Sequence, residues 1–360
     1  MNDDLPMPSD VKSPPPPGGP GAPAESTLIE PPSAKLIVRL FLIPFFIVAA
    51  AVGVMFLIGR LAGGTPSFDE AMTRLRNPGG ERTVDVLVGP GSKQRYMDAK
   101  TIADKIMKVG ATSAERVKLS DDLIDILDHH TNDGEGDVRH FLLLALGRVW
   151  QIDPSQPQEE SPAAVEARQR ALATLLKYAD TGVVSNQKAA ILALAYWSGR
   201  DELRQAIPKL IAKLKDESQD LDVRLAAATV LGPIAKPTDQ ETIDALHFAM
   251  RDTNPADIEL VWGSALSLAE LNQKDVADTI LLLLDRKELS SVKVLDRETD
   301  PKNPTYHLLS DQEQQRILIN TMIGAAKLDV AAVQERLRWL KENDPSPRVR
   351  AAAQEVLTRK

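Results

Sequence analysis

Apolar and polar positions follow a helical period over most of the chain. From residue 94 to residue 360, apolar residues recur at steps of three and four, and the pattern breaks at clusters of Gly, Pro or Asp. The face formed by Leu119, Leu123 and Ile126 is one example. This pattern predicts an all-α fold for residues 94–360, which form one repeat domain.

A turn-rich segment precedes the helical region. Residues 63–93 contain N-P-G-G at Asn77–Gly80 and G-P-G-S at Gly89–Ser92, and both are typical of turns. The segment is therefore predicted to be a linker that contains one short helix, at Phe68–Arg76.

A motif recurs within the helical region. The segment Asp137–Arg139, D-V-R, precedes FLLLALG, and the segment Asp222–Arg224, again D-V-R, precedes LAAATVLG. Arg316 and Arg350 begin two further copies, and two more copies lack the arginine. The six copies align on positions 139, 187, 224, 261, 316 and 350, which lie 34 to 55 residues apart. This period is typical of arrays of two-helix units.

Helix pairs at this period, with the D-V-R and A-x-x-L-G signatures, resemble HEAT repeats. The resemblance covers residues 94–360 and is most specific in the copy IPKLIAKLKDESQDLDVRLAAATVLGPIA. It implies an α-solenoid of about six HEAT-like helix pairs, each stacked on its neighbours. Because the resemblance is to a class of repeat, it implies a scaffold and no particular activity.

The residues of the motif are expected to have structural roles. Asp137, Asp222 and Ser346 precede the second helices of their pairs and are expected to cap the free N–H groups there. Gly147 and Gly232 are expected to end these helices and to turn the chain toward the next pair. Four arginines are expected to point along the stack toward an acidic or carbonyl acceptor of the adjacent repeat. These structural residues are Arg139, Arg224, Arg316 and Arg350.

Two steps of the repeat are longer than the others and contain polar insertions. The first is the loop Gln151–Pro162, and the second is Arg286–Leu309, which carries Pro301 and Pro304. Unstructured insertions of this length in a compact array are usually functional or disordered. The sequence leaves both interpretations of the 286–309 insert open, a partner-binding loop or tolerated disorder.

The N-terminal residues differ in composition from the rest. Residues 1–35 are rich in Pro and Gly and have few large apolar side chains, so they are expected to be a disordered tail. The segment Leu40–Gly59 carries no charge and lies between Arg39 and Arg60. As a helix it would span about 30 Å, the thickness of the hydrocarbon layer of a bilayer. Residues 36–62 are therefore predicted to be a transmembrane helix of a single-pass membrane protein, with the lipid bilayer as a partner.

The charges that flank this segment leave its orientation open. Lys35 and Arg39 lie on its N-terminal side, and Arg60, Arg74 and Arg76 follow it. A short acidic tail is easily translocated, which favours a cytoplasmic C-terminal domain, whereas the absence of cysteine favours the opposite orientation. We expect the C-terminal domain to be cytoplasmic.

Composition and motifs also restrict the chemistry of the chain. It has no cysteine, which excludes disulfides, thiolate metal sites and a cysteine nucleophile, and its net charge of −8 argues against a nucleic-acid partner. The segment Gly89–Lys93 departs from the phosphate-binding loop template. The segment His129–His140 is rich in His and Asp but fits a calcium loop in neither register. We expect no catalytic, cofactor-binding or metal-binding residues, no cofactor, and no enzymatic activity.

Together these features predict a membrane-anchored repeat scaffold or adaptor. It would bind a protein partner through the face of the solenoid or through the 286–309 insert, and the sequence gives no indication of a small-molecule substrate. Two alternatives stay open: an enzyme or enzyme subunit whose site is not recognised, and a structural component of the cell envelope. A scaffold predicts a co-purifying protein without turnover, whereas an enzyme predicts a buried cluster of titratable groups.

Overall fold

The computed structural model of the chain describes most of the region predicted to be helical. The described residues are 66–77, 92–106, 112–132, 134–151, 161–252, 254–296, 303 and 305–358. All of them belong to one compact unit, Thr65–Lys360. The predicted tail, 1–35, and the predicted membrane helix, 36–62, lie outside the described residues.

The described residues form an all-α, helical-repeat-like fold of 15 α-helices, of which fourteen associate in seven pairs. The first helices of the pairs are α3 (Phe68–Arg76), α6 (Ser113–His129), α8 (Pro162–Asp180), α10 (Ile207–Lys215), α12 (Gln240–Met250), α14 (Ala277–Leu283) and α17 (Ala331–Asn343). The second helices are α5 (Ser92–Lys105), α7 (Gly136–Val149), α9 (Val184–Leu194), α11 (Leu221–Ile234), α13 (Ile258–Glu270), α16 (Asp311–Ala325) and α18 (Pro347–Thr358).

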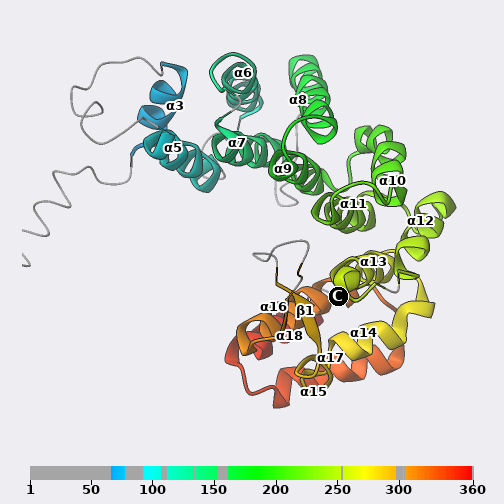
Figure 1. Cartoon of the computed structure of the whole chain (residues 1–360). Helices are drawn as coiled ribbons and strands as arrows, with labels where there is room; N and C mark the ends of the chain where they lie inside the picture. The colour runs from blue at the N-terminus through cyan, green and yellow to red at the C-terminus, as the bar shows by residue number, and fades with distance from the viewer. Residues whose placement is uncertain are drawn as a thin grey trace, which may run out of the picture. The chain divides into compact units, whose positions relative to one another are not determined.

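The second helices form a continuous row. From α5 to α18 each packs on the next in chain order, and the first helices α6, α8, α10 and α12 form a second row beside them (Figure 1). The six positions on which the sequence motif was aligned all fall in second helices, α7, α9, α11, α13, α16 and α18. The motif therefore marks the row through which successive pairs contact each other.

The first pair lies partly in the segment predicted to be a linker. Helix α3 occupies the predicted bounds Phe68–Arg76, and it packs on α5 as the first helices of the other pairs pack on theirs. Arg74 joins the two helices: its Nε and Nη2 donate to the Asp98 carboxylate at 2.9 and 2.6 Å, and the Asp98 side chain is fully buried. The described array thus begins before residue 94 and has seven pairs instead of about six.

The glycines of the motif do not end their helices, contrary to expectation. Gly147 and Gly232 lie inside α7 and α11, two residues before the last one. A Cβ on Gly232 would lie 2.8 Å from the Cα of Ser267 in α13. Glycine at these positions therefore allows the backbones of neighbouring second helices to approach closely.

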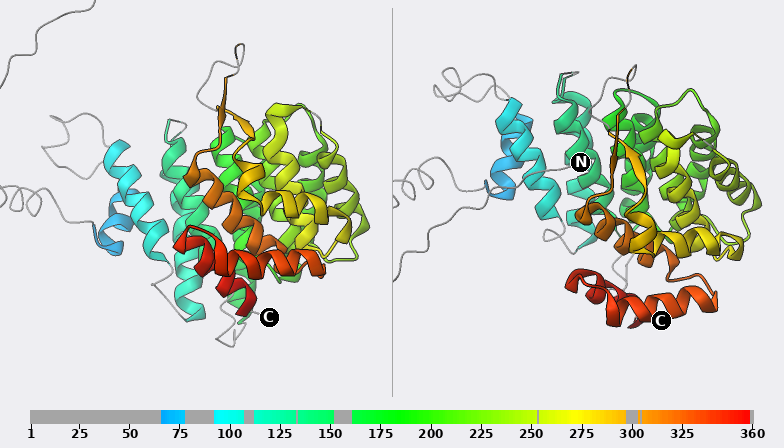
Figure 2. Two further views of the ribbon diagram at one scale, coloured as in Figure 1. Left: turned by 90° about the horizontal axis from the view of Figure 1, so that it is seen from below. Right: turned by 60° about the horizontal axis from the view of Figure 1, so that its bottom comes forward.

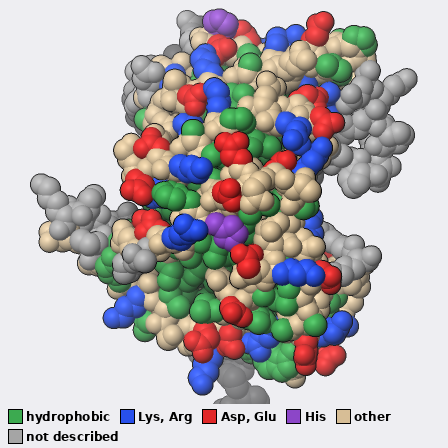
Figure 3. Space-filling view, turned by 90° about the vertical axis from the view of Figure 1, so that its right-hand side faces the viewer, with side chains coloured by type: hydrophobic (Ala, Val, Ile, Leu, Met, Phe, Trp, Pro, Cys, Tyr) green, Lys and Arg blue, Asp and Glu red, His purple; other side chains and the backbone are tan. Residues whose placement is uncertain are grey.

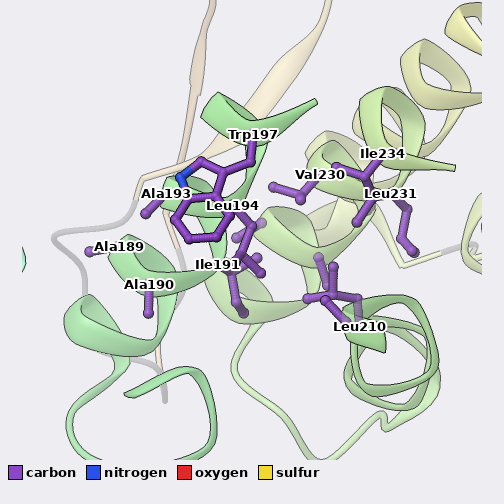
Figure 4. Packing of buried hydrophobic residues seen from close by; sticks show 14 of the residues in the cluster. Ala189, Ala190, Ile191, Ala193, Leu194, Trp197, Leu210, Val230, Leu231 and Ile234 are labelled. Carbon is purple, nitrogen blue, oxygen red and sulfur yellow. The ribbon is translucent and has the colours of Figure 1, made fainter. Parts of the chain in front are cut away.

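Small and large apolar side chains alternate in the core between the rows. In α9, Ala189, Ala190 and Ala193 are fully buried and leave space for the indole of Trp197 (Figure 4). The indole is fully buried, and its Nε1 donates a 2.7 Å hydrogen bond to the carbonyl oxygen of Gly147 in the preceding pair. Packing and a satisfied polar group together hold the second and third pairs in register.

The 286–309 insert contains ordered structure in its described residues. It begins with the short helix α15 (Arg286–Leu289) and continues with the antiparallel strands β1 (Lys293–Leu295) and β2 (Tyr306–Leu308), in the register Val294↔His307. In both views of Figure 2 the strands lie side by side and rise from the orange helix α16. We call this hairpin, β1 and β2, the arm, and α15 its base. The insert is therefore neither disorder nor a plain loop over these residues.

The membrane prediction is corrected by the structure. Among the helices of the described residues, none combines the length and apolar character needed to cross a bilayer. The segment on which the prediction depended, residues 40–59, lies outside that part of the chain. The expected single-pass membrane localisation is therefore not supported.

Candidate functional site

The two aspartates of the motif lie in the first turn of their helices instead of capping them. Asp137 is the second residue of α7, after the N-cap residue Glu135, whose side chain makes no capping hydrogen bond. In α11 the cap is Asp220, which accepts a 2.8 Å hydrogen bond from the N–H of Asp222. The carboxylate of Asp222 instead accepts from Nζ of Lys188, 2.8 Å away in the preceding second helix.

The third expected cap, Ser346, directly precedes Pro347 at the start of α18. Its Oγ donates a 2.9 Å hydrogen bond to the side-chain oxygen of Gln315 in α16. This serine therefore connects the last two second helices, which is a role that the capping prediction did not include.

Two of the four motif arginines, Arg139 and Arg350, donate to acceptors at the end of the first helix of their own pair and not to the adjacent repeat. Arg139 on α7 donates to the side chain and carbonyl oxygens of Thr131, just after α6, at 2.9 and 3.4 Å. Arg350 on α18 donates to the carbonyl oxygen of Asp344, just after α17, at 2.6 Å. A cation placed on the last carbonyls of a helix satisfies them and complements the helix dipole. Arg316 differs, since it is exposed and its side chain has no hydrogen bond or ion pair within the described residues.

Arg224 has both kinds of contact. Its side chain is 6% exposed, and its Nε donates to the carbonyl oxygen of Leu214 in α10 at 3.2 Å. Its Nη1 lies 3.8 and 3.9 Å from the carboxylates of Asp252 and Asp257 in the next pair. Burial, and then the neighbouring Asp252, raises the pKa of Asp257. Arg224 therefore joins the end of its own first helix to an acidic pair of the next repeat.

The sequence motif missed an equivalent arginine in the first pair. Arg95 on α5 is buried, and its Nη1 donates to the carbonyl oxygen of Leu75 in the last turn of α3 at 3.1 Å. It also contacts the carboxylate of Glu135 and the carbonyl oxygen of His130 in the next pair. Its distance from Arg139 in the sequence, which matches the repeat period, is the signal that identifies it.

The His- and Asp-rich segment is a helix end. Nδ1 of His129 lies 3.0 Å from the carboxylate of Asp125, one turn earlier in α6, and Nε2 of His130 lies 3.5 Å from the same carboxylate. Over the described ranges, the structure has no group of three or more His, Asp or Glu side chains that could hold a metal ion.

The arm is fixed firmly to the array at its base. Leu289 in α15 and Val294 in β1 are buried, and β1 packs beside the 3₁₀ helix η5 (Pro255–Asp257). Arg286 donates to the carboxylate of Asp344 through Nε and Nη2 at 2.9 and 3.0 Å, and its Nη1 donates to Asp311 at 2.8 Å. These hydrogen bonds raise the pKa of the Arg286 guanidinium, which is the effect of a close ion pair on a cation.

The outer strand of the arm is exposed along its whole length. Tyr306 is 40% exposed and Leu308 is 55% exposed, which is unusual for large apolar side chains on an ordered element. On the other face of β2, Nε2 of His307 lies 3.2 Å from the Glu313 carboxylate. Glu313 also accepts hydrogen bonds from the side chain and the backbone of Ser310, and these bonds lower its pKa to about 2.

A second group of exposed apolar side chains lies on the first helices. Phe248 in α12 and Leu282 in α14 are each 41% exposed, and Trp339 in α17 is exposed beside Arg336, whose guanidinium lies 4.5 Å from the indole. Figure 3 shows hydrophobic side chains gathered on the lower half of the face that α12 and α14 present. Along a helix the backbone groups are bonded within the helix itself, whereas an edge strand leaves a row of them unpaired, so this face provides fewer directional contacts than the arm.

Comparisons with known proteins give a similarity of fold class alone. No family model and no curated protein matches the chain. A solved structure, human deoxyhypusine hydroxylase in complex with glycerol, is similar at 15% identity and a TM-score of 0.30, over 81% of this chain and 94% of that chain.

This finding corrects the expectation that the chain is not an enzyme, because the similar structure is that of an enzyme. At this identity and TM-score, however, the similarity brings no activity to the chain.

Proposed function

We propose that the chain is a HEAT-like α-solenoid scaffold that binds a partner protein through its arm. The observation that carries the proposal is the exposure of Tyr306 and Leu308 on an element that is itself well ordered. Aromatic and aliphatic side chains that are exposed together on a folded surface mark sites of protein association.

The fixed base of the arm supports this proposal. Binding is weakened by the entropy lost when mobile groups become ordered, so a surface that is already held in place binds more tightly. The Arg286 ion pairs and the buried Val294 hold the arm before any partner is present. A helical array with a projection held in place in this way is suited to positioning a partner.

The net charge of the chain and the contacts of its arginines favour a protein partner over nucleic acid. The net charge of −8 disfavours nucleic acid, whose phosphates require a basic surface. The motif arginines Arg139, Arg224 and Arg350 are bound to carbonyl groups within the array. A protein partner recognised by apolar contacts agrees with both observations.

Site-specific crosslinking in the native host tests the proposal. The full chain carries benzoylphenylalanine in place of Tyr306 in one sample and in place of Phe248 in the control, because both aromatic side chains are about equally exposed, at 40% and 41%. After irradiation, mass spectrometry identifies the crosslinked proteins. We expect a distinct partner at position 306 and none at position 248. A partner found at position 248 alone would place binding on the helical face and reject the arm.

A further inference from the structure

We propose that the free edge of β2 takes up an extended segment of the partner protein as a third strand. The inference rests on the proposed binding through the arm, and it adds how binding occurs and what kind of segment binds. An edge strand presents a row of unpaired N–H and C=O groups, and recognition by strand addition uses these groups.

The hydrogen bonds between the two strands show which backbone N–H and C=O groups are already paired within the arm. The N–H of Asp296 donates to the carbonyl oxygen of Thr305 at 2.9 Å, and the N–H of Leu309 donates to that of Val292 at 3.3 Å. In an antiparallel ladder, hydrogen-bonded pairs alternate with pairs that are not hydrogen-bonded. In the residues next to the hydrogen-bonded pairs, the N–H and C=O groups therefore point away from the opposite strand of the arm.

The outward-pointing residues of β2 are Tyr306 and Leu308. They lie opposite Leu295 and Lys293 in the register, at the positions that are not hydrogen-bonded. Their N–H and C=O groups have no partner in the part of the chain that the structure describes. Two donors and two acceptors are thus available, at the spacing that an added strand requires.

The two edges of the arm differ in what lies beside them among the described residues. Strand β1 packs beside η5, and its Val294 is buried. All three residues of β2 are exposed. An incoming strand is therefore expected to pair with β2 and to extend the sheet to three strands away from the array.

The side chains of β2 define what kind of segment fits. Tyr306 and Leu308 are two residues apart, so their side chains lie on the same face of the arm. A strand added beside β2 places every second side chain on that face, where apolar residues pack against them. His307 lies on the opposite face, near Glu313. The occupant is an extended segment of a partner protein with apolar residues at alternate positions.

Peptide selection tests the inference without knowledge of the partner. The probe is a library of random nine-residue peptides displayed on phage and selected on the immobilised full chain, and the recovered peptides are then synthesised and their affinity is measured. We expect recovered sequences with apolar residues at alternate positions. Leu308→Pro removes one outward N–H and leaves the ladder to β1 intact, so it should weaken peptide binding about tenfold or more.

Lys293→Pro is the matched control. Lys293 lies directly opposite Leu308 in the register, and this substitution removes an outward N–H from the other strand of the arm. Peptide affinity should therefore change little in Lys293→Pro. N-methylation of alternate amides in the recovered peptides removes peptide N–H donors to β2 without changing the protein. This second measurement tests the inference even if Leu308→Pro fails to fold.

Several outcomes would overturn the inference. These are recovery of no peptide, equal affinity for Leu308→Pro and the unaltered chain, and retained affinity of the N-methylated peptides. A dimer detected by sedimentation that Leu308→Pro dissociates would also overturn it, because a second copy would then be the occupant.

The crosslinking experiment separates the two proposals. A partner that still crosslinks at position 306 when Leu308→Pro is present would support binding through the arm and reject strand addition. Absence of any crosslink at position 306 in the otherwise unaltered chain would reject binding through the arm itself.

Discussion

Gly147 in α7 lies against the backbone of Ala193 in α9 so closely that no side chain fits between them. A Cβ on this glycine would lie 2.6 Å from the alanine carbonyl oxygen and 2.9 Å from its Cα. Backbone atoms of a packed helix cannot move aside as the end of a flexible side chain can. The contact therefore fixes how closely two successive pairs approach.

Gly147→Ala should lower the stability of the array by about 1–3 kcal/mol through overpacking, although alanine is the better helix former. The control is Gly136→Ala at the start of the same helix, where the added Cβ would lie 3.5 Å from its nearest neighbour and should be tolerated. Thermal unfolding followed by circular dichroism compares the two variants. Equal melting temperatures for both would show that the two helices can separate without cost.

Arg224→Ala should lower the stability by about 1–3 kcal/mol, because it leaves the buried Leu214 carbonyl oxygen and the acidic pair of the next repeat without their cation. Arg316→Ala is the control, since Arg316 is exposed and should change stability by less than about 0.5 kcal/mol. Urea unfolding measures both variants. A similar loss in the two would contradict the prediction, because the exposed Arg316 makes no such contacts.

Arg286→Ala should destabilise the array by about 3 kcal/mol, because the carboxylate of Asp344 would remain buried without its ion pair. The Asp344 side chain is only 1% exposed, so little water solvates its carboxylate in place of the guanidinium. Lys287→Ala, at the next and exposed position, should have little effect. Hydrogen exchange should show the loss of protection in α17 and α18 as well as in the arm, and a loss confined to the arm would contradict the prediction.

The stability of the chain should depend on Glu313 in acid. The hydrogen bonds from Ser310 hold the pKa of Glu313 at about 2 in the folded chain, below its usual value of 4.5. Its contribution is therefore fully present above pH 4.5 and is lost as the pH falls toward about 2. Glu313→Gln keeps an acceptor for the capping box but does not titrate. The unaltered chain should lose stability more steeply than this variant across that window, and parallel curves would contradict the assignment.

Local patterns in the sequence were sufficient for the helices and their order. The bounds of α3 agree with the expected Phe68–Arg76, since Ser67 and Glu70 form a capping box that fixes the start of the helix. The six aligned positions fall on second helices because two periods can be recognised in the sequence, the 3.6-residue period of apolar residues and the spacing of the motif copies. The first pair was missed because Arg95 lacks the D-V-R context of the other motif arginines.

Contacts between residues that lie far apart in the sequence could not be predicted from it. The carbonyl group that accepts from Arg224 belongs to Leu214, and nothing in local pattern separates this acceptor from one in the next repeat. Strands β1 and β2 have three residues each, which is too short for alternation to be recognised. The exposed edge at Tyr306 and Leu308 follows from the pairing register alone, and that register is a property of the folded chain.

The ion pairs of Arg286 also give the arm a mechanical property. This one side chain holds Asp311 at the start of α16 and Asp344 just after the end of α17, so the base of the arm is joined to two successive helix pairs. A force applied to β2 would therefore be transmitted to both pairs at once, through α16 and through the end of α17, instead of peeling the hairpin away from a single helix.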